Sequence, residues 1–516
     1  MSSIFTTKQW FEKLMNFQGS LGIFEYGEII TSLFLLKHLD GRFKSQREKI
    51  KQEGREEELE ESISYLSDGI TYLPKEARWA EIREKSKEAH LGVCLDEAFE
   101  LIQEEDPRLE GVIRRNCFTH SKLQKGNLNT LMDVVEGMYG AEESEERFIQ
   151  KFQELLNEFA KKAGKVEKDY KHTELTASKL LVALLEPDRG RIYDPCFGTA
   201  SLLLEAAKYI KKDQEHLDDV SFYGQELSEP MQKLAKINFA INGAELFSKE
   251  PACTFHNDQH LDLAGKVDYI VTSPPANQPD WRSEAGLIED ERWEKYGIPP
   301  ANNANYAWVT HIIHKLSRNG IAALFFPQRS LYSLGDEKRI RQKIIEEDLV
   351  EAVILLPKRI VYNDDKQLSI LVINNNKNRR TIKFQGQERT FRDRGGEVLF
   401  IDARKIAGIK VEGDLQLSLE DISKIVATFK SWRYEFSGSE MEDIEKIRHK
   451  RVTLQEIRET DYSLFLDKYL LYDSGEEKQD LSSLIEKKKE IERNLLILFE
   501  TEEEKKRRVQ EFLRRS

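Results

Sequence analysis

The sequence predicts an α/β fold, with a mainly parallel sheet at its centre and helical segments at both ends of the chain. Between about residues 172 and 405, short runs rich in β-forming residues alternate with runs of helical periodicity, which is typical of parallel sheets covered on both faces. Before this region, and again after it, apolar residues recur at helical spacing. We therefore divide the 516 residues into an N-terminal helical domain (1–165), an α/β domain (166–405) and a C-terminal helical region (406–516), because so long a chain exceeds one compact core.

The composition is typical of a globular protein, with 39% hydrophobic and 33% charged residues. No apolar run of about 18 residues predicts a membrane span, and the first residues do not have the pattern of a secretory signal. The four cysteines are scattered and form no CxxC pair, which disfavours a metal site or a disulfide framework and suits the cytoplasm. The net charge of −13 argues against a surface that is basic throughout. Binding to nucleic acid would therefore need a local basic face or a more basic partner.

The terminal regions show their helical character in spaced apolar residues. Two such stripes precede residue 140: Ile29, Ile30, Leu33, Phe34, Leu36 and Leu39; Leu95, Ala98, Phe99 and Ile102. We expect a further helix within 142–171 that leads into the α/β domain. Near the C-terminus, Leu484, Ile491, Leu495 and Leu498 follow steps of three and four, which fits either a short coiled coil or a packed helical hairpin.

Seven strands are expected in the α/β domain. They are Arg191–Tyr193, Ser221–Gly224, Cys253–His256, Tyr269–Thr272, Ile321–Phe326, Glu351–Leu356 and Leu368–Asn374. Helices are expected at Ser201–Ile210, Met231–Ile241, Tyr306–Leu316 and Lys338–Glu346. The last two strands are joined by 357–367, which is too short for a helical crossover, so we expect them to be antiparallel. Seven strands with a terminal hairpin suit the sheet of a class I methyltransferase (Rossmann-like) better than a plain dinucleotide-binding fold.

A first candidate site is the turn from Asp194 to Ser201, which joins the first strand to a helix. Gly198 permits a tight turn, and the small residues Thr199 and Ala200 let a ligand approach the backbone. The helix N-terminus would direct N–H groups toward the polar end of a cofactor. Only one glycine is present, so the segment is not a G-x-G-x-x-G fingerprint, and a plain strand–helix turn is the alternative.

Two acidic residues follow the next two predicted strands. Glu226 ends the second strand run and could accept hydrogen bonds from both hydroxyls of a ribose. Asp258, after the third, could accept a hydrogen bond from an adenine amino group. A surface acid and a turn-forming aspartate are the alternative interpretations.

The segment Ser273-Pro274-Pro275-Ala276 follows the fourth predicted strand. Two prolines cannot extend the hydrogen-bond ladder, so they indicate a rigid loop. The amine of a nucleobase is a poor nucleophile, because its lone pair is delocalised into the ring. One side-chain acceptor and one backbone carbonyl could hold its two N–H groups and direct the lone pair at an electrophilic methyl group. The base would have to be flipped out of the duplex to reach them.

These sites, in this order, resemble the modification (M) subunit of type I restriction–modification systems, an S-adenosylmethionine-dependent methyltransferase that acts on N6 of adenine in DNA. Segments that match the family occur along nearly the whole chain: Phe24-Glu25-Tyr26, Leu36-Lys37-His38-Leu39, Ala77-Arg78-Trp79, Asp106-Pro107-Arg108-Leu109-Glu110-Gly111, Asp194-Pro195, Gly198-Thr199, Gly224-Gln225-Glu226-Leu227, Arg292-Trp293, Asn303-Ala304-Asn305-Tyr306-Ala307-Trp308, Val452-Thr453-Leu454 and Tyr462-Ser463-Leu464.

The resemblance implies S-adenosylmethionine as cofactor and DNA as substrate. It assigns catalysis to Ser273, Pro274 and Pro275, and cofactor binding to Thr173, Asp194, Gly198, Thr199, Glu226 and Asp258. It also implies a specificity (S) subunit as partner, with a second M subunit and a restriction subunit as further candidates. The helical ends of the chain would serve in subunit association within this restriction system.

The sequence departs from the family pattern in the catalytic motif and in the cofactor-binding segments. Ser273 stands where the family has Asn, and Ala276 where it has an aromatic residue. Ala200 and Ser201 replace two glycines, Phe197 replaces a smaller residue, and Thr173-Glu174 replaces Thr-Pro. Either Tyr306, Trp308 or Trp281 supplies the missing aromatic ring, or methyl transfer is impaired and the chain is a methyltransferase-like subunit that binds DNA or a partner. Because Ser-Pro-Pro is typical of N4-cytosine methyltransferases, that activity is a further alternative.

Overall fold

The computed structural model describes residues 6–85, 90–120, 123, 125–139, 144–166, 175–213, 217, 219–358, 367–406, 408–411, 414–435 and 447–470. The N-terminal part of this chain is helical, as predicted. Its α-helices are α1 (Thr7–Met15), α2 (Ile23–Gln52), α3 (Ile63–Leu66), α4 (Trp79–Lys85), α5 (Leu91–Glu105), α6 (Lys125–Tyr139) and α7 (Glu145–Val166). Three 3-10 turns lie among them: η1 (Glu56–Glu58), η2 (Lys75–Ala77) and η3 (Pro107–Leu109).

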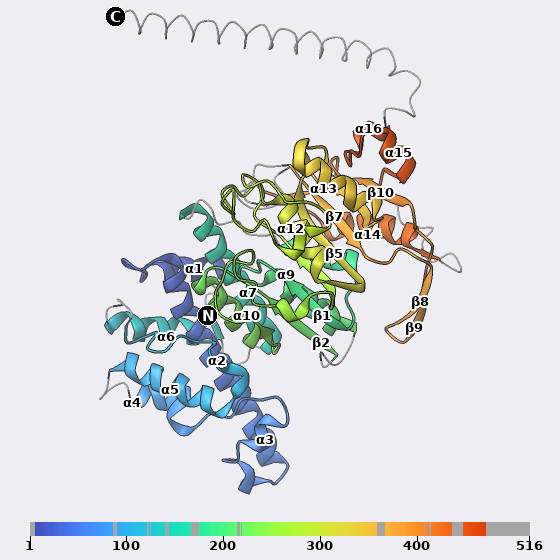
Figure 1. Ribbon diagram of the computed structural model, residues 1–516. Helices are drawn as coiled ribbons and strands as arrows, with labels where there is room; N and C mark the ends of the chain where they lie inside the picture. The colour runs from blue at the N-terminus through green and yellow to red at the C-terminus, as the bar shows by residue number, and fades with distance from the viewer. Residues whose placement is uncertain are drawn as a thin grey trace, which may run out of the picture.

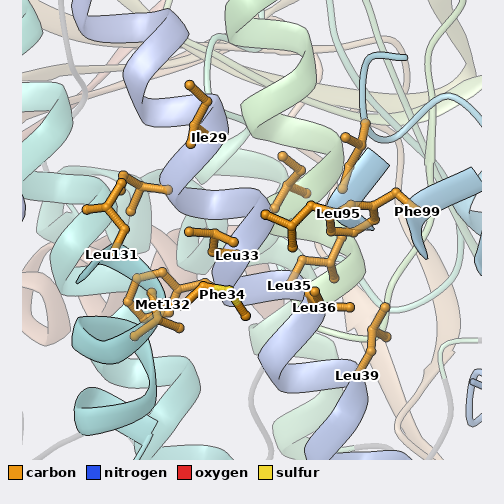
Figure 2. Packing of buried hydrophobic residues seen from close by; sticks show 14 of the residues in the cluster. Ile29, Leu33, Phe34, Leu35, Leu36, Leu39, Leu95, Phe99, Leu131 and Met132 are labelled. Carbon is orange, nitrogen blue, oxygen red and sulfur yellow. The ribbon is translucent and has the colours of Figure 1, made fainter. Parts of the chain in front are cut away.

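Helix α2 is the centre of the N-terminal helices. Its residues from Ile29 to Asp40 are all buried, so it is enclosed on every side rather than on one face. Figure 2 shows Leu33, Phe34 and Leu36 in the core with side chains from α5 and α6. This core also takes in Ile237 and Ile241 of helix α10 (Glu229–Ile241), which belongs to the α/β domain. The helical region and the sheet region therefore share apolar contacts.

A nine-stranded sheet forms the second part of the molecule (Figure 1), in the order β14-β10-β6-β7-β5-β4-β1-β2-β3. Its strands are β1 (Gly190–Asp194), β2 (Val220–Gly224), β3 (Leu246–Phe247), β4 (Val267–Thr272), β5 (Leu316–Pro327), β6 (Val350–Leu355), β7 (Leu368–Asn374), β10 (Glu397–Asp402) and β14 (His449–Thr453). Strands β1 to β5 pair in parallel, whereas β7 pairs antiparallel to both β5 and β6. The predicted terminal hairpin is thus confirmed.

Helices cover both faces of this sheet. The remaining helices are α8 (Leu175–Leu185), α9 (Ser201–Asp213), α11 (Glu291–Glu294), α12 (Asn305–Lys315), α13 (Gly335–Glu346), α14 (Leu419–Arg433), α15 (Leu454–Glu459) and α16 (Asp467–Leu470). Side chains of β5 alternate between the faces: Ala323 and Phe325 pack with α8, α9 and α14, and Ala322 and Leu324 with α12 and α13. This alternation explains why β5 appears as an unbroken apolar run in the sequence.

Two predictions about the strands were wrong: the number of seven, because β10 and β14 also join the sheet and make nine, and the position of the third strand. The third strand is Leu246–Phe247, and Cys253–His256 instead forms a turn, in which Asn257 N donates to Cys253 O at 2.8 Å. A strand of two residues is too short to show a periodicity, so the sequence pattern gives no signal that places it.

The region 406–516 was predicted to be helical, and this is only partly right. Helices α14 to α16 lie in it, but so does β14, which extends the sheet beyond β10. Short strands β11 (Ile409–Val411), β12 (Asp414–Gln416) and β13 (Tyr434–Glu435) are also present, and β13 pairs with the hairpin of β8 (Arg380–Phe384) and β9 (Gln387–Phe391). The division of the chain at residues 165 and 405 stays a prediction.

The last part of the chain lies outside the described residues, including Leu484, Ile491, Leu495 and Leu498, so their predicted seam is not described. Among the described residues, each helix is too short or too polar to cross a bilayer.

Candidate active site

The turn between β1 and α9 has an open backbone. Gly198 has a φ of +57°, and a Cβ placed on it would contact only Met231 Cε, at 3.7 Å. Ala200 also has a positive φ, of +60°, a conformation that is strained for a residue with a side chain. The turn is held by the N–H of Ala200, which donates to Phe197 O at 2.7 Å. The open backbone at Gly198, with the α9 N-terminus beside it, fits the polar end of a nucleoside cofactor.

Glu226 lies beside this turn, where β2 ends. Its Oε2 accepts a hydrogen bond from Gly198 N at 2.9 Å, and its Oε1 accepts one from Ser228 N at 2.9 Å. Burial raises the pKa of the carboxyl, while these backbone N–H groups oppose the shift. Each oxygen retains a lone pair, so the fixed carboxylate can still accept hydrogen bonds from ribose hydroxyls.

The third loop, from 252 to 260, is fixed to the second by the side chain of Gln225. Its Nε2 donates to Ala252 O at 3.0 Å and to Asn257 O at 2.8 Å, and its Oε1 accepts from Gln259 N at 3.0 Å. Gln225 is 1% exposed, so it is a structural clamp rather than a ligand. This role of Gln225 was not predicted, although the residue stands in the matched Gly224-Gln225-Glu226-Leu227 segment.

Asp258 lies on this loop, but its carboxylate is already engaged within the protein. Oδ1 accepts from His260 N at 3.0 Å, and Oδ2 forms an ion pair with the buried Lys315 at 2.7 Å. Lys315 Nζ also donates to His260 O at 2.7 Å. Asp258 therefore anchors the loop to α12, and its predicted bond to an adenine amino group would have to share an oxygen with one of these partners.

The tips of β1 and β4 are neighbours and are joined by side chains. Asp194 Oδ1 accepts a hydrogen bond from Thr272 Oγ1 at 2.7 Å and another from Cys196 N at 3.0 Å. The Cys196 Sγ lies 3.3 Å from the same Thr272 oxygen. Asp194 and Thr272 are almost fully buried, and burial raises the pKa of Asp194 to about 7. These contacts hold the turn after β1 against the residue that precedes Ser273.

The Ser273-Pro274-Pro275 loop leaves β4 at this junction. Ser273 and Pro274 are partly exposed and Pro275 is exposed. The loop is anchored at its far end, where Asn277 N donates to Asn305 Oδ1 and Asn305 Nδ2 donates to Asn277 Oδ1, both at 2.8 Å. Among the described residues, none is hydrogen-bonded to the Ser273 hydroxyl, so this oxygen is available at a rigid position.

The three aromatic residues proposed to replace the ring missing at Ala276 are all buried. Tyr306 is 2% exposed and donates to Ser330 O, on the α12 and α13 side of the sheet. Trp281 and Trp308 are 3% and 5% exposed, and both pack on Phe255 with ring centroids 4.7 and 4.2 Å apart. The prediction that one of them offers a face to a base is therefore wrong for this conformation, because helical and loop packing encloses them.

Thr173, the remaining predicted cofactor residue, lies outside the described residues, as does Glu174. Thr272 and Asn305, which fix the two ends of the serine–proline loop, were not singled out by the sequence. Asn305 stands in the matched 303–308 segment, and Thr272 directly precedes the motif, so position in a motif was the available signal for both.

A sheet in this strand order, with an open turn after β1 and an acid after β2, defines a class I S-adenosylmethionine-dependent methyltransferase fold. Comparisons with known proteins narrow the class. Residues 143–479 match the family "N-6 DNA Methylase", and residues 14–138 match "HsdM N-terminal domain". The chain belongs to the N-6 DNA methylase family, among the methylase subunits of type I restriction enzymes.

Several relatives are similar along most of their length. The type I restriction enzyme HindI methylase subunit of Haemophilus influenzae is 32% identical over 420 residues, which cover 77% of this chain and 89% of the relative. The MjaIX methylase subunit of Methanocaldococcus jannaschii is 28% identical over 95% of this chain and 88% of its own.

A solved structure confirms the fold. The type I restriction–modification methyltransferase subunit from Streptococcus thermophilus has a TM-score of 0.71 at 22% identity, covering 90% of this chain and 99% of that one. These comparisons do not favour the N4-cytosine alternative or the interpretation as a non-enzymatic binding subunit.

Proposed function

We propose that this chain is the modification subunit of a type I restriction–modification complex and transfers a methyl group from S-adenosylmethionine to N6 of adenine in DNA. The observation that carries the proposal is the junction of the β1 and β4 tips through Asp194 and Thr272. It places the open cofactor turn beside the Ser273 loop, and methyl transfer needs the donor and the acceptor base in contact.

The proposed cofactor site consists of Gly198, Thr199 and Glu226, which are partly exposed, with Thr173 proposed from the resemblance alone. The buried Asp194 fixes the turn of this site, and Asp258, paired with Lys315, fixes its third loop. The open backbone at Gly198 and the α9 N-terminus would receive the polar end of the cofactor, and the Glu226 carboxylate its ribose hydroxyls. S-adenosylmethionine, when bound there, supplies an electrophilic methyl group on its sulfonium sulfur. Leu227, next to Glu226, is 66% exposed and offers an apolar surface for the adenine ring of the cofactor.

The target adenine would be held by the serine–proline loop. Ser273 Oγ and the carbonyl of Pro274 would accept hydrogen bonds from the two N–H groups of the base amine. This arrangement would direct the nitrogen lone pair toward the methyl group. As the new N–C bond forms, the bond between the methyl carbon and the sulfonium sulfur would break, its electron pair would stay on sulfur, and the amine would release one proton to solvent. Pro275 limits the motion of the loop, so that the acceptors do not have to be ordered during the reaction.

DNA and a specificity subunit are the proposed partners, with a second M subunit and a restriction subunit as further candidates. The family relation supports a multisubunit assembly, because the relatives are named as subunits of type I restriction enzymes. We place the complex in the cytoplasm, where its DNA substrate is.

The proposal is tested with this chain co-purified with its specificity subunit. Unmodified plasmid DNA is incubated with S-adenosylmethionine, and the nucleosides are separated by mass spectrometry. We expect N6-methyladenine as the methylated product. N4-methylcytosine instead, or no methylated nucleoside together with no heat of S-adenosylmethionine binding in calorimetry, would contradict it.

A further inference from the structure

The turn after β5 exposes two large apolar side chains. Tyr332 is 44% exposed and Leu334 is 76% exposed, with Ser333 between them, after the 3-10 turn η5 (Gln328–Leu331). The ring of Tyr332 packs on that of Phe465, with ring centroids 5.1 Å apart. Exposed apolar side chains that lie together indicate a binding surface more often than isolated ones do. Among the described residues, two aromatic side chains are strongly exposed, Phe247 and Tyr332. Phe247 lies on β3 at the edge of the sheet, whereas Tyr332 follows the central strand β5.

The backbone of this turn is held by a buried arginine. Arg341 of α13 is 2% exposed, and its guanidinium donates to Ser330 O at 3.1 Å and to Ser333 O at 2.9 Å. Its Nε donates to Tyr462 O at 2.8 Å, which ties the segment before α16 to the same point. A buried charge is costly unless its hydrogen bonds are satisfied. The hydrogen bonds of the buried Arg341 hold the backbone on both sides of Tyr332 and so give Tyr332 and Leu334 a fixed position, as a preorganised contact requires.

The turn lies next to the loop proposed to hold the target base. Strand β5 pairs in parallel with β4, so the carboxyl ends of both strands lie on the same side of the sheet. Asn305 Nδ2 donates to Ser330 Oγ at 2.7 Å as well as to Asn277 Oδ1, so one side chain links the turn to the loop that follows Ser273. The exposed Arg329 at the start of the turn adds a positive charge that suits a phosphate.

We propose that Tyr332 and Leu334 contact the base stack of duplex DNA beside the target adenine and stabilise its extruded state. The inference rests on the proposed function. An enzyme that flips a base must support the disrupted stack, and apolar side chains commonly do so. Ala276 has no ring, and Tyr306, Trp281 and Trp308 are buried, so within the described ranges Tyr332 is the strongly exposed aromatic residue on the turn that Asn305 links to the target loop. A protein subunit on the same surface is the competing occupant that the experiment separates.

The experiment compares Tyr332→Ala, Tyr332→Phe and Leu334→Ala in the complex with the specificity subunit. Leu261→Ala is the matched control, because Leu261 is 65% exposed on the 3-10 turn η4 (Leu261–Leu263), which precedes β4. Loss of one base–aromatic stack predicts methylation of unmodified plasmid about ten- to hundredfold slower in Tyr332→Ala. Tyr332→Phe and Leu261→Ala should retain the wild-type rate, and S-adenosylmethionine binding should be unchanged in all variants.

A second substrate identifies the cause. The methylated adenine is located by sequencing the modified plasmid, and a duplex with a mismatch opposite that adenine is then prepared. A mismatched base is easier to extrude, so on this duplex the Tyr332→Ala complex should regain most of the wild-type methylation rate. Wild-type rates in both Tyr332→Ala and Leu334→Ala would overturn the inference. A loss of rate that the mismatch does not restore, or that accompanies dissociation of the specificity subunit, would overturn it as well. A wild-type complex that methylates nothing would remove the proposed function and, with it, this role of the turn.

Discussion

Replacing Thr272 with valine tests the junction between the two strand tips. Valine keeps the shape of the side chain but removes the hydroxyl that donates to Asp194 Oδ1 at 2.7 Å. Asp194 is 1% exposed and Thr272 is fully buried, so water cannot replace the lost donor. A buried acceptor that loses a partner costs about 1–3 kcal/mol of unfolding free energy, and the upper end applies when the acceptor is charged.

The cost should depend on pH. The pKa of Asp194 is about 7, so the carboxyl is mostly neutral at pH 6 and mostly charged at pH 8. We therefore expect Thr272→Val to be more destabilising at pH 8 than at pH 6, measured by urea unfolding. Thr31→Val is the control, because Thr31 is also fully buried but bonds only to the α2 carbonyls of Gly27 and Glu28. Its cost should stay below about 1 kcal/mol at both pH values.

The same variant should slow methyl transfer, because a displaced loop loses its orientation toward the methyl donor. A misplacement of about 1 Å can cost on the order of a hundredfold in rate. Incorporation of labelled methyl groups into plasmid DNA, by the complex with its specificity subunit, measures this effect. The role of the junction would be refuted if Thr272→Val and Thr31→Val had equal unfolding free energies at both pH values and equal rates of methyl transfer.

Three further predictions concern the turn after β1 and the Glu226 carboxylate beside it. The folded pKa of Asp194 is raised to about 7, above its unfolded value, so its contribution to stability is lost as pH rises toward 7. Relative to Asp194→Asn, the wild-type unfolding free energy should fall between about pH 4 and 7 by up to about 1.4 kcal/mol per pH unit in urea titrations; parallel curves would contradict this. Glu226→Gln should weaken S-adenosylmethionine binding in calorimetry by about ten- to a hundredfold, because hydrogen bonds to a charged group are lost; unchanged affinity would remove Glu226 from the site. Ala200→Gly relieves the strain of a φ of +60°, whereas Ala206→Gly removes an equally buried methyl group from a regular helix. In thermal unfolding, Ala200→Gly should therefore be about 1–2 kcal/mol less destabilising than Ala206→Gly. Equal losses of unfolding free energy would show that the turn is not strained.

The sheet and its two loops could be predicted because their signals are local. Strand–helix alternation located β1, β2 and β4, and the short 357–367 connection predicted the antiparallel β7. The two-residue β3 and the late strand β14 were missed, because the first has no periodicity and the second pairs with β10 from far along the chain. Long-range pairing of this kind leaves no pattern within a sequence window.

The site was harder to predict than the fold, because its contacts join residues far apart in sequence. Asp194 and Glu226 lie at their expected strand ends, which follows from the parallel topology. The ion pair of Asp258 with Lys315 and the link from Thr272 to Asp194 depend on packing. Burial of Tyr306 also follows from packing, since its helical position alone did not show which side faces the sheet.

The measurement that tests the account most directly is N6-methyladenine formation by the complex with Ser273→Ala, compared with Ser221→Ala. Both serines are partly exposed, but Ser221 lies at the opposite end of β2 from Glu226. We expect wild-type and Ser221→Ala complexes to methylate plasmid DNA at similar rates. The Ser273→Ala complex should lose at least about tenfold in rate, with S-adenosylmethionine binding intact. Equal methylation by Ser273→Ala would contradict the placement of the target adenine on this loop.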